Sequence, residues 1–313
     1  MSEPATATHA PFGRVLVAMV TPFQGDGSLD IDGAQRLATH LVDSGCDGLV
    51  VNGTTGESPT CTDDEQQRLV RAVVDAVGDR AHVVAGAGSN DTAHSVELAR
   101  SAEKAGATGL LVVTPYYNKP PQAGLIRHFT ALADATALPT MLYDIPHRTG
   151  TAIRTETILQ LASHERIVAV KDAKDDLAAS SWVLARTDLA YYCGSDALNL
   201  PMLSIGAVGF VSVVGHFFAA DLQAMIAAYD AGDNAGALAI HRRLLPAYQG
   251  IFATQGVITT KAALGLLGLP GGPVRAPLVD ATDDEVAALR IAMTASGVDM
   301  TQISTANGST ANG

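Results

Sequence analysis

The chain has 313 residues, of which 47% are hydrophobic and 17% charged, and its formal net charge at pH 7 is −12. This composition is typical of a soluble globular protein and excludes a largely disordered chain. The acidic balance also argues against nucleic acid as a partner, because binding to phosphates requires a basic surface.

The residues that commonly hold metals are scattered. Cys46, Cys61 and Cys193 form no CxxC pair, and the nine histidines form no HxxxH or HExxH pair. We therefore expect neither a disulfide nor a metal site. The first residues lack the pattern of a signal peptide, and no apolar run is long enough to span a membrane. These observations predict a cytoplasmic protein.

Residues 1–13 are small and polar and are expected to be flexible. Short apolar runs then recur every 20 to 35 residues or so, and such runs are typical of the buried strands of a parallel sheet. The predicted strands are 15–20, 48–51, 82–85, 109–113, 139–143, 167–171, 190–193 and 209–214.

Helix signals separate these strands. Asp30 or Ser28 is placed to cap a helix running to about residue 44, and Thr62 with Glu65 forms a capping-box pattern before a helix ending near Gly78. Asp91 opens a further helix, and a fourth is predicted over about 121–136.

Eight strand–helix units predict an α/β fold of the (β/α)₈ barrel type over residues 14–220. A doubly wound open sheet is the alternative, but it usually has fewer strands and a dinucleotide loop. Gly86-Ala87-Gly88 does not extend to GxGxxG, so the barrel is favoured. Residues 221–298 predict a C-terminal helical region, with helices at 221–231, 234–252, 257–267 and 283–295. Residues 299–313 repeat Ser-Thr-Ala-Asn-Gly and predict a flexible tail.

Lys171 directly follows the buried strand that begins at Ile167. The carboxyl ends of barrel strands carry active sites, and burial there disfavours the ammonium form of a lysine. The resulting neutral amine is a nucleophile suited to a Schiff base with a keto acid. The alternative is a lysine at a strand end whose aliphatic side chain extends far enough for the ammonium group to reach water.

The other strand ends place hydroxyl groups around this lysine. A phenol can relay the protons of carbinolamine chemistry, threonine hydroxyls can bind a carboxylate, and an arginine can bind a second anion. The strand-end residues are Thr21, Thr54, Thr55, Tyr116, Tyr117, Tyr143, Arg148, Lys171, Asp196 and His216.

Four motifs in this order carry a family resemblance. They are Gly53–Ser58 (GTTGES), Tyr116–Pro120 (YYNKP), Tyr143–Gly150 (YDIPHRTG) and Val170–Asp172 (VKD). Together they closely resemble the 4-hydroxy-tetrahydrodipicolinate (dihydrodipicolinate) synthase family. Their exact sequences resemble those of actinobacterial members. The family belongs to the pyruvate-dependent class I aldolases, which also include N-acetylneuraminate lyase. The resemblance runs from about Val15 to Ala295.

The resemblance implies a role for each matching residue. Lys171 would form the Schiff base with pyruvate, Tyr143 would shuttle protons, and Thr54 would relay them. Tyr117 would complete the relay from a neighbouring subunit, in a homotetramer built from tight dimers. No metal or organic cofactor is implied.

The resemblance also implies how the substrates are bound. Thr55 would hold the pyruvate carboxylate, and Arg148 would receive the carboxylate of L-aspartate 4-semialdehyde. Val211 would place its carbonyl near the lysine, and Gly194 would contact substrate. The implied activity is a lyase that condenses these two substrates in the diaminopimelate and lysine pathway.

Two other functions stay open. Another aldolase of the superfamily could act on a sugar acid, but Arg148, five residues after Tyr143, favours the semialdehyde. A catalytically silent barrel is the second, and its mark would be loss of Lys171 or Tyr143, both of which are present.

Further residues near the motifs are expected to have structural roles. Glu57 is expected to orient its loop, and Cys193 to be buried. We expect His147 and His216 to be bystanders, and Asp172 and Lys174 to Asp176 to form a solvated helix start.

The resemblance predicts weak or absent inhibition by lysine. Lysine-inhibited members use histidines after GTTGES, and an asparagine and a glutamate after the third strand. Here the corresponding residues are Asp63 and Gln66, then Asn90 and His94, with Tyr116 retained.

Overall fold

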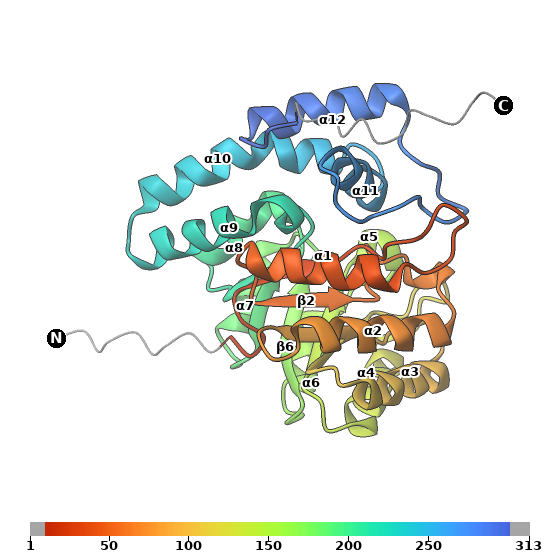
Figure 1. The fold of residues 1–313 in the computed structure, drawn as a ribbon. Coiled ribbons are helices and arrows are strands. Elements are labelled where there is room, and N and C mark those ends of the chain that lie inside the picture. Colours follow the sequence, from red (N-terminus) through yellow and green to blue (C-terminus); the bar gives the residue numbers. More distant parts are fainter. Residues whose placement is uncertain (1–9, 301–313) are drawn as a thin grey trace.

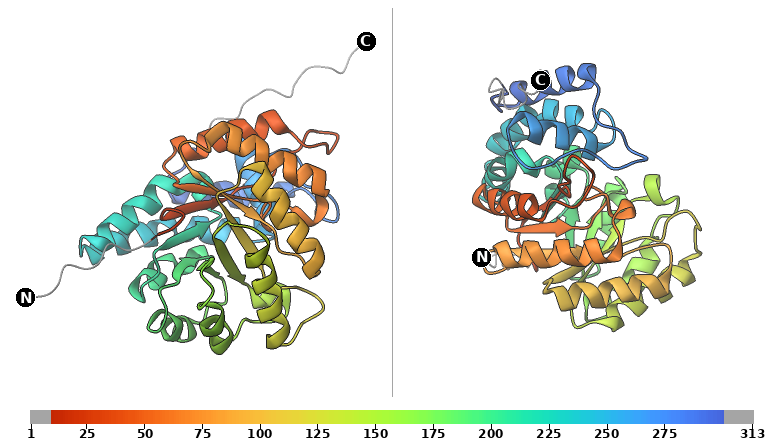
Figure 2. Two further views of the ribbon diagram at one scale, coloured as in Figure 1. Left: turned by 90° about the horizontal axis from the view of Figure 1, so that it is seen from below. Right: turned by 45° about the vertical axis from the view of Figure 1, so that its right-hand side comes forward.

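The computed structural model describes residues 10–300, and within them eight parallel strands form a closed barrel in chain order (Figures 1 and 2). The predicted barrel is confirmed. The strands are β1 (Val15–Ala18), β2 (Gly48–Val51), β3 (His82–Gly86), β4 (Gly109–Val113), β5 (Thr140–Asp144), β6 (Ile167–Asp172), β7 (Ala190–Cys193) and β8 (Gly209–Ser212).

Helices surround the barrel, as the left view of Figure 2 shows. They are α1 (Ile31–Asp43), α2 (Asp63–Val77), α3 (Thr92–Ala105), α4 (Gln122–Ala135), α6 (Thr155–Leu161), α7 (Leu177–Leu184), α8 (Asn199–Ser204) and α9 (Gly215–Asp230). Shorter helical turns lie at strand ends: η1 (Ser58–Thr60), α5 (Pro146–Thr149) and η2 (Asp196–Leu198).

The strands are short apolar segments because both of their faces are covered. All four residues of β1, β2, β7 and β8 are buried, as expected for a parallel barrel with a packed interior and a helical coat. The prediction for β8 ran two residues too far: the amides of Val213 and Val214 donate to the carboxylate of Asp196 instead of to a neighbouring strand.

The helix starts follow the capping residues. Asp30 accepts from the amide of Gly33 at the start of α1, and Asp91 accepts from the amide of Ala93 at the start of α3. Thr62 and Glu65 form the complete capping box of α2. A cap of this kind contributes about 1 kcal/mol to stability.

A C-terminal helical region follows the barrel, drawn in cyan to blue at the top of Figure 1. It consists of α10 (Asn234–Ile251), α11 (Gly256–Leu266) and α12 (Asp283–Ala295), with α10 packed on α9 and α12 packed on α10. The region lies beside the carboxyl ends of the strands, because α10 and α11 line the same cavity as Lys171.

The helical coat of the barrel extends past the predicted boundary at residue 220. Helix α9 begins at Gly215, bends at Phe218 and packs against β1, so the predicted boundary cuts the helix that follows β8. Phe12 and Met300 are both buried, so the core reaches into both predicted flexible segments. The rest of those segments, 1–9 and 301–313, lies outside the described residues. Within residues 10–300, no helix is both long and apolar enough to cross a membrane.

Candidate active site

Lys171 lies in β6 directly opposite Tyr143 of β5. Both side chains line one cavity, whereas Asp144 and Asp172, one residue further along each strand, do not, as expected from the alternation of side chains in a strand. Only 5% of Lys171 is exposed. Gly194, at the end of β7, leaves room for the lysine, since a Cβ atom there would lie 3.0 Å from Lys171 Cε.

Burial lowers the pKa of the Lys171 ammonium to about 8, because the charged form loses its hydration in the barrel. The carboxylate of Asp196 opposes this shift, and the Arg148 guanidinium adds to it. A substantial fraction of the amine is therefore neutral and nucleophilic near pH 8.

The Lys171 amine lies over the face of Tyr143, with Nζ 4.2 Å from the ring centroid. Burial raises the pKa of the Tyr143 phenol to about 12, although Arg148 and a hydrogen bond with the Thr54 side chain both act in the opposite direction. The phenol thus keeps its proton at neutral pH, and its hydrogen bond joins it to the side chain of Thr54.

Asp196 provides a fixed negative group on the other side of the lysine. Its carboxylate accepts hydrogen bonds from the amides of Val213 and Val214 and from the side chain of Asn199. The Ser212 hydroxyl is a further donor. Burial raises the pKa of Asp196, and these donors lower it. The sequence placed Asp196 at the rim without a role; here it is the carboxylate that most favours the charged form of Lys171.

The cavity has a volume of about 500 Å³ and connects the strand ends to the C-terminal helices. Thr54, Thr55, Tyr143, Lys171 and Gly194 form its barrel side. The other side is formed by residues of the C-terminal region: Leu245, Tyr248 and Gln249 of α10, Phe252 just after it, and Gln255, Gly256 and Val257 at the start of α11. This size suits a small molecule.

Arg148 stands at the exposed end of this cavity, in the helical turn α5 that follows β5. Its Nη2 atom donates to Gln255 Oε1 at 2.8 Å. The guanidinium therefore has one donor group held by the C-terminal region, and its remaining donors can bind an anion.

Tyr117 is not brought to Lys171 within this chain. It is 88% exposed, and its backbone adopts the left-handed conformation with φ of 71°, which is uncommon for a residue with a side chain. Tyr116 and Tyr117 instead line a second cavity of about 330 Å³, which shares Thr54, Tyr143 and Arg148 with the first.

Val211 is fully buried in β8 and is not among the residues that line the first cavity; Val213 is. His216 is also buried, accepts from the amide of Val20 and lines neither cavity. His147 lines the first cavity, and Cys193 is buried.

The expectation of a solvated helix start is wrong for Asp172. This residue still belongs to β6, is buried and accepts a hydrogen bond from Ser180 of α7, because the side chain after Lys171 must face the helical coat. Lys174 is also largely buried, 3.5 Å from Asp144. Asp176 does cap α7, by accepting from the amide of Ala179.

The sequence did not identify the helical side of the cavity. Leu245, Tyr248 and Phe252 follow one another at helical spacing in and just after α10, and this pattern is equally typical of a helix that packs on a core. The spacing of these three residues alone therefore could not show that they line a cavity.

Residues 11–296 match the model of the "Dihydrodipicolinate synthetase family". A 4-hydroxy-tetrahydrodipicolinate synthase of Acidothermus cellulolyticus is 71% identical over 288 residues, which cover 92% of this chain and 94% of that protein. A second such synthase, from Streptomyces coelicolor, is 64% identical and covers 95% of this chain and 99% of its own.

Solved structures agree with this match. The structure of the synthase from Cyanidioschyzon merolae with lysine bound has a TM-score of 0.91 and 44% identity, with 92% of this chain and 99% of that chain covered.

Proposed function

We propose a mechanism from one premise: this chain belongs to the dihydrodipicolinate synthetase family and is a 4-hydroxy-tetrahydrodipicolinate synthase, a lyase of lysine biosynthesis. In the proposed mechanism, Lys171 binds pyruvate as a Schiff base and the bound pyruvate condenses with L-aspartate 4-semialdehyde. The observation that carries the proposal is the buried Lys171 amine, with its pKa lowered to about 8 and its Nζ lying 4.2 Å from the centre of the Tyr143 ring.

The first half of the reaction activates pyruvate. The neutral amine of Lys171 attacks the C2 carbonyl, and the carbinolamine loses water to give an iminium ion. The iminium then loses a proton from the methyl group and becomes an enamine. Each step moves a proton, and Tyr143 with Thr54 provides the relay, because their side chains are hydrogen-bonded to each other beside the amine.

The second half forms the new carbon–carbon bond. The enamine attacks the aldehyde carbon of the semialdehyde, and the hydroxyl that forms takes up a proton. The amino group of the semialdehyde then attacks C2 and displaces the Lys171 amine, which closes the ring and regenerates the enzyme. Atoms balance, with one water released during iminium formation.

Two residues bind the substrate carboxylates. Thr55, on the barrel side of the cavity, holds the carboxylate of pyruvate beside Gly194, whose missing side chain leaves room for Lys171. Arg148 binds the carboxylate of the semialdehyde. It stands at the exposed end of the same cavity, and only its Nη2 atom donates to Gln255, so its other N–H groups can bind the carboxylate.

Tyr117 acts in the site of a neighbouring subunit, within a homotetramer made of two tight dimers. Two observations support this assignment. An aromatic side chain that is 88% exposed on a strained backbone has little reason to persist in an isolated chain. Beside it lies the second cavity, which reaches Thr54 and Tyr143 and could receive the same tyrosine of another copy.

Substrate competition tests the proposal. Purified enzyme is given pyruvate with L-aspartate 4-semialdehyde, and separately N-acetylneuraminate or 2-keto-3-deoxygluconate, and kcat/KM is measured for each. We expect the semialdehyde to be preferred by on the order of a hundredfold or more, the loss typical when a charged partner goes unmatched. Faster cleavage of either sugar acid would reject the proposed second substrate.

A further inference from the structure

A buried ion pair joins the loop after β2 to the C-terminal helical region. Lys261 of α11 lies with its Nζ 2.6 Å from Glu57 Oε1, and the side chains are 2% and 1% exposed. Neither residue lines the cavity around Lys171. Glu57, however, is only three residues from Thr54, which hydrogen-bonds with Tyr143.

Both members of the pair are fully engaged. The second oxygen of Glu57 accepts from the amide of Arg275 at 2.8 Å, and Lys261 also donates to the carbonyl of Pro273 at 2.8 Å. The Lys261 amine lies 4.2 Å from the ring centroid of Phe23, in the loop after β1. Burial lowers the pKa of Lys261, and the hydrogen bond to Glu57 raises it, so the ammonium depends on this carboxylate for its charge.

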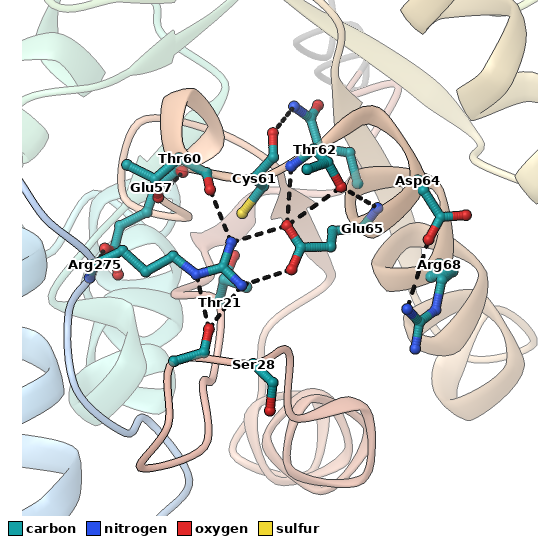
Figure 3. A network of polar contacts seen from close by, with 12 residues as sticks. Thr21, Ser28, Glu57, Thr60, Cys61, Thr62, Asp64, Glu65, Arg68 and Arg275 are labelled. Carbon is teal, nitrogen blue, oxygen red and sulfur yellow. Dashed lines mark hydrogen bonds and ion pairs between the residues drawn. The ribbon is translucent and has the colours of Figure 1, made fainter.

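Arg275 binds the C-terminal end of the loop after β2 (Figure 3). Its guanidinium donates to both carboxylate oxygens of Glu65 and to the carbonyl of Thr60, and it also donates to the carbonyl of Gly27. Residues from the C-terminal region therefore contact the loops after both β1 and β2.

The backbone transmits the position of Glu57 to Thr54. Glu57 adopts the left-handed conformation with φ of 53°, and its amide donates to the carbonyl of Thr54 at 3.1 Å. The amide of Gly56 donates to the carbonyl of Gly53 within the same turn. A shift of the Glu57 carboxylate would therefore move the turn that carries Thr54 and Thr55.

We propose that Lys261 and Glu57 are positioning residues: their buried ion pair holds the turn of Thr54 and Thr55 in place beside Tyr143 and Lys171. This inference rests on the proposed Schiff-base chemistry. Stability alone is a poor explanation for the pair, because replacing a buried ion pair by apolar groups of similar size is often neutral or stabilising. An ion pair instead requires a defined geometry, because each buried charge is satisfied only while its partner stays in place.

The test uses Glu57→Gln, Lys261→Met and the double variant Glu57→Gln/Lys261→Met. Melting temperature, kcat of the condensation, and the rate and final extent of pyruvate trapping by borohydride are measured on the full-length enzyme. Leu289→Ala, in α12, is the control, because it removes buried apolar volume from the same C-terminal region and changes no charge.

We expect both single variants to lower the melting temperature, since each leaves one buried charge alone. The double variant regains the melting temperature but not the rate. Trapping and kcat stay slower by on the order of ten- to a hundredfold, because a misplacement of about 1 Å at a catalytic group can cost that much. The final extent of trapping is unchanged, because Lys171 itself is intact, and Leu289→Ala lowers the melting temperature without slowing trapping.

If the double variant regains the wild-type rate together with its melting temperature, or if Leu289→Ala slows trapping equally, the pair only stabilises the fold and the proposal is overturned. Should a single variant fail to fold, the double variant decides alone. A wild-type enzyme that traps no pyruvate would instead refute the proposed chemistry.

Discussion

Lys171 and Tyr143 are register partners on neighbouring barrel strands, and the lysine amine lies 4.2 Å from the centre of the phenol ring. The β5–β6 ladder fixes this register, so both side chains start from paired backbone positions at the same end of the barrel. The same burial lowers the pKa of the amine to about 8 and raises that of the phenol to about 12. One environment thus favours both the neutral form of the amine and the protonated form of the phenol.

The buried amine should cost the protein stability. The pKa of Lys171 is lower in the folded chain than its ordinary value of 10.5, so the unfolded chain binds the proton more tightly and stability rises with pH from about 8 to about 10.5. Lys171→Met should therefore raise the free energy of unfolding near pH 7 by about 3 kcal/mol, at about 1.4 kcal/mol per pKa unit. Urea titrations at several pH values measure this, and a gain that persists undiminished above about pH 11 would contradict the assigned cause.

Gln255 should tune the affinity for the second substrate through Arg148. Gln255→Glu places a carboxylate where the amide oxygen now accepts from Arg148 Nη2, and an ion pair there would compete with the substrate carboxylate. We expect KM for the semialdehyde to rise about tenfold, equal to about 1.4 kcal/mol of lost binding. KM for pyruvate should stay unchanged. Gln249→Glu is the matched control, because Gln249 lines the same cavity and has no hydrogen bond to Arg148; equal effects of both variants would show a general charge effect instead.

An intact Tyr117 in one subunit should restore activity to the site of a neighbouring subunit whose own Tyr117 has been replaced. Tyr117→Phe and Lys171→Ala are each expected to have little activity alone. In a mixed dimer of the two variants, one site combines an intact Lys171 with the partner's intact Tyr117, so activity should return to about half the wild-type value per dimer. Coexpression with two affinity tags isolates such dimers. Absence of recovery would show that Tyr117 acts within its own chain or not at all.

Lysine should be a weak inhibitor or none. In place of the expected histidine and glutamate, Asp63 and His94 are 3.1 Å apart and bond to each other between α2 and α3. Gln66 likewise donates to the carbonyls of Ser58 and Cys61. An inhibition curve with half-loss of activity at sub-millimolar lysine would reject this prediction.

The sequence predicted the barrel well because the strands are short buried runs and because several helices, among them α1, α2 and α3, begin at capping residues that can be recognised. The candidate site was predicted from the same regularity: residues after successive strands converge on one end of the barrel, so Thr54, Thr55, Tyr143 and Lys171 had to lie close together. Their individual roles came from the resemblance and remain proposals.

Contacts across long separations were not predictable. The ion pair between Glu57 and Lys261 joins residues about two hundred positions apart, and no local pattern identifies its partners. The same is true of Gln255 beside Arg148. The prediction for Asp172 was wrong because a charged residue near a strand end is usually expected to be exposed. Asp172 is instead the last residue of β6, and its place in the strand points its side chain toward the surrounding helices.

The central claim is a covalent bond between pyruvate and Lys171. The enzyme is incubated with pyruvate, reduced with borohydride, digested and mapped by mass spectrometry, with Lys171→Ala treated in parallel. The account predicts an adduct of reduced pyruvate on Lys171 in the wild-type enzyme and no adduct in the variant. An adduct on another lysine, such as Lys174 or Lys261, or an adduct that persists in Lys171→Ala, would contradict it.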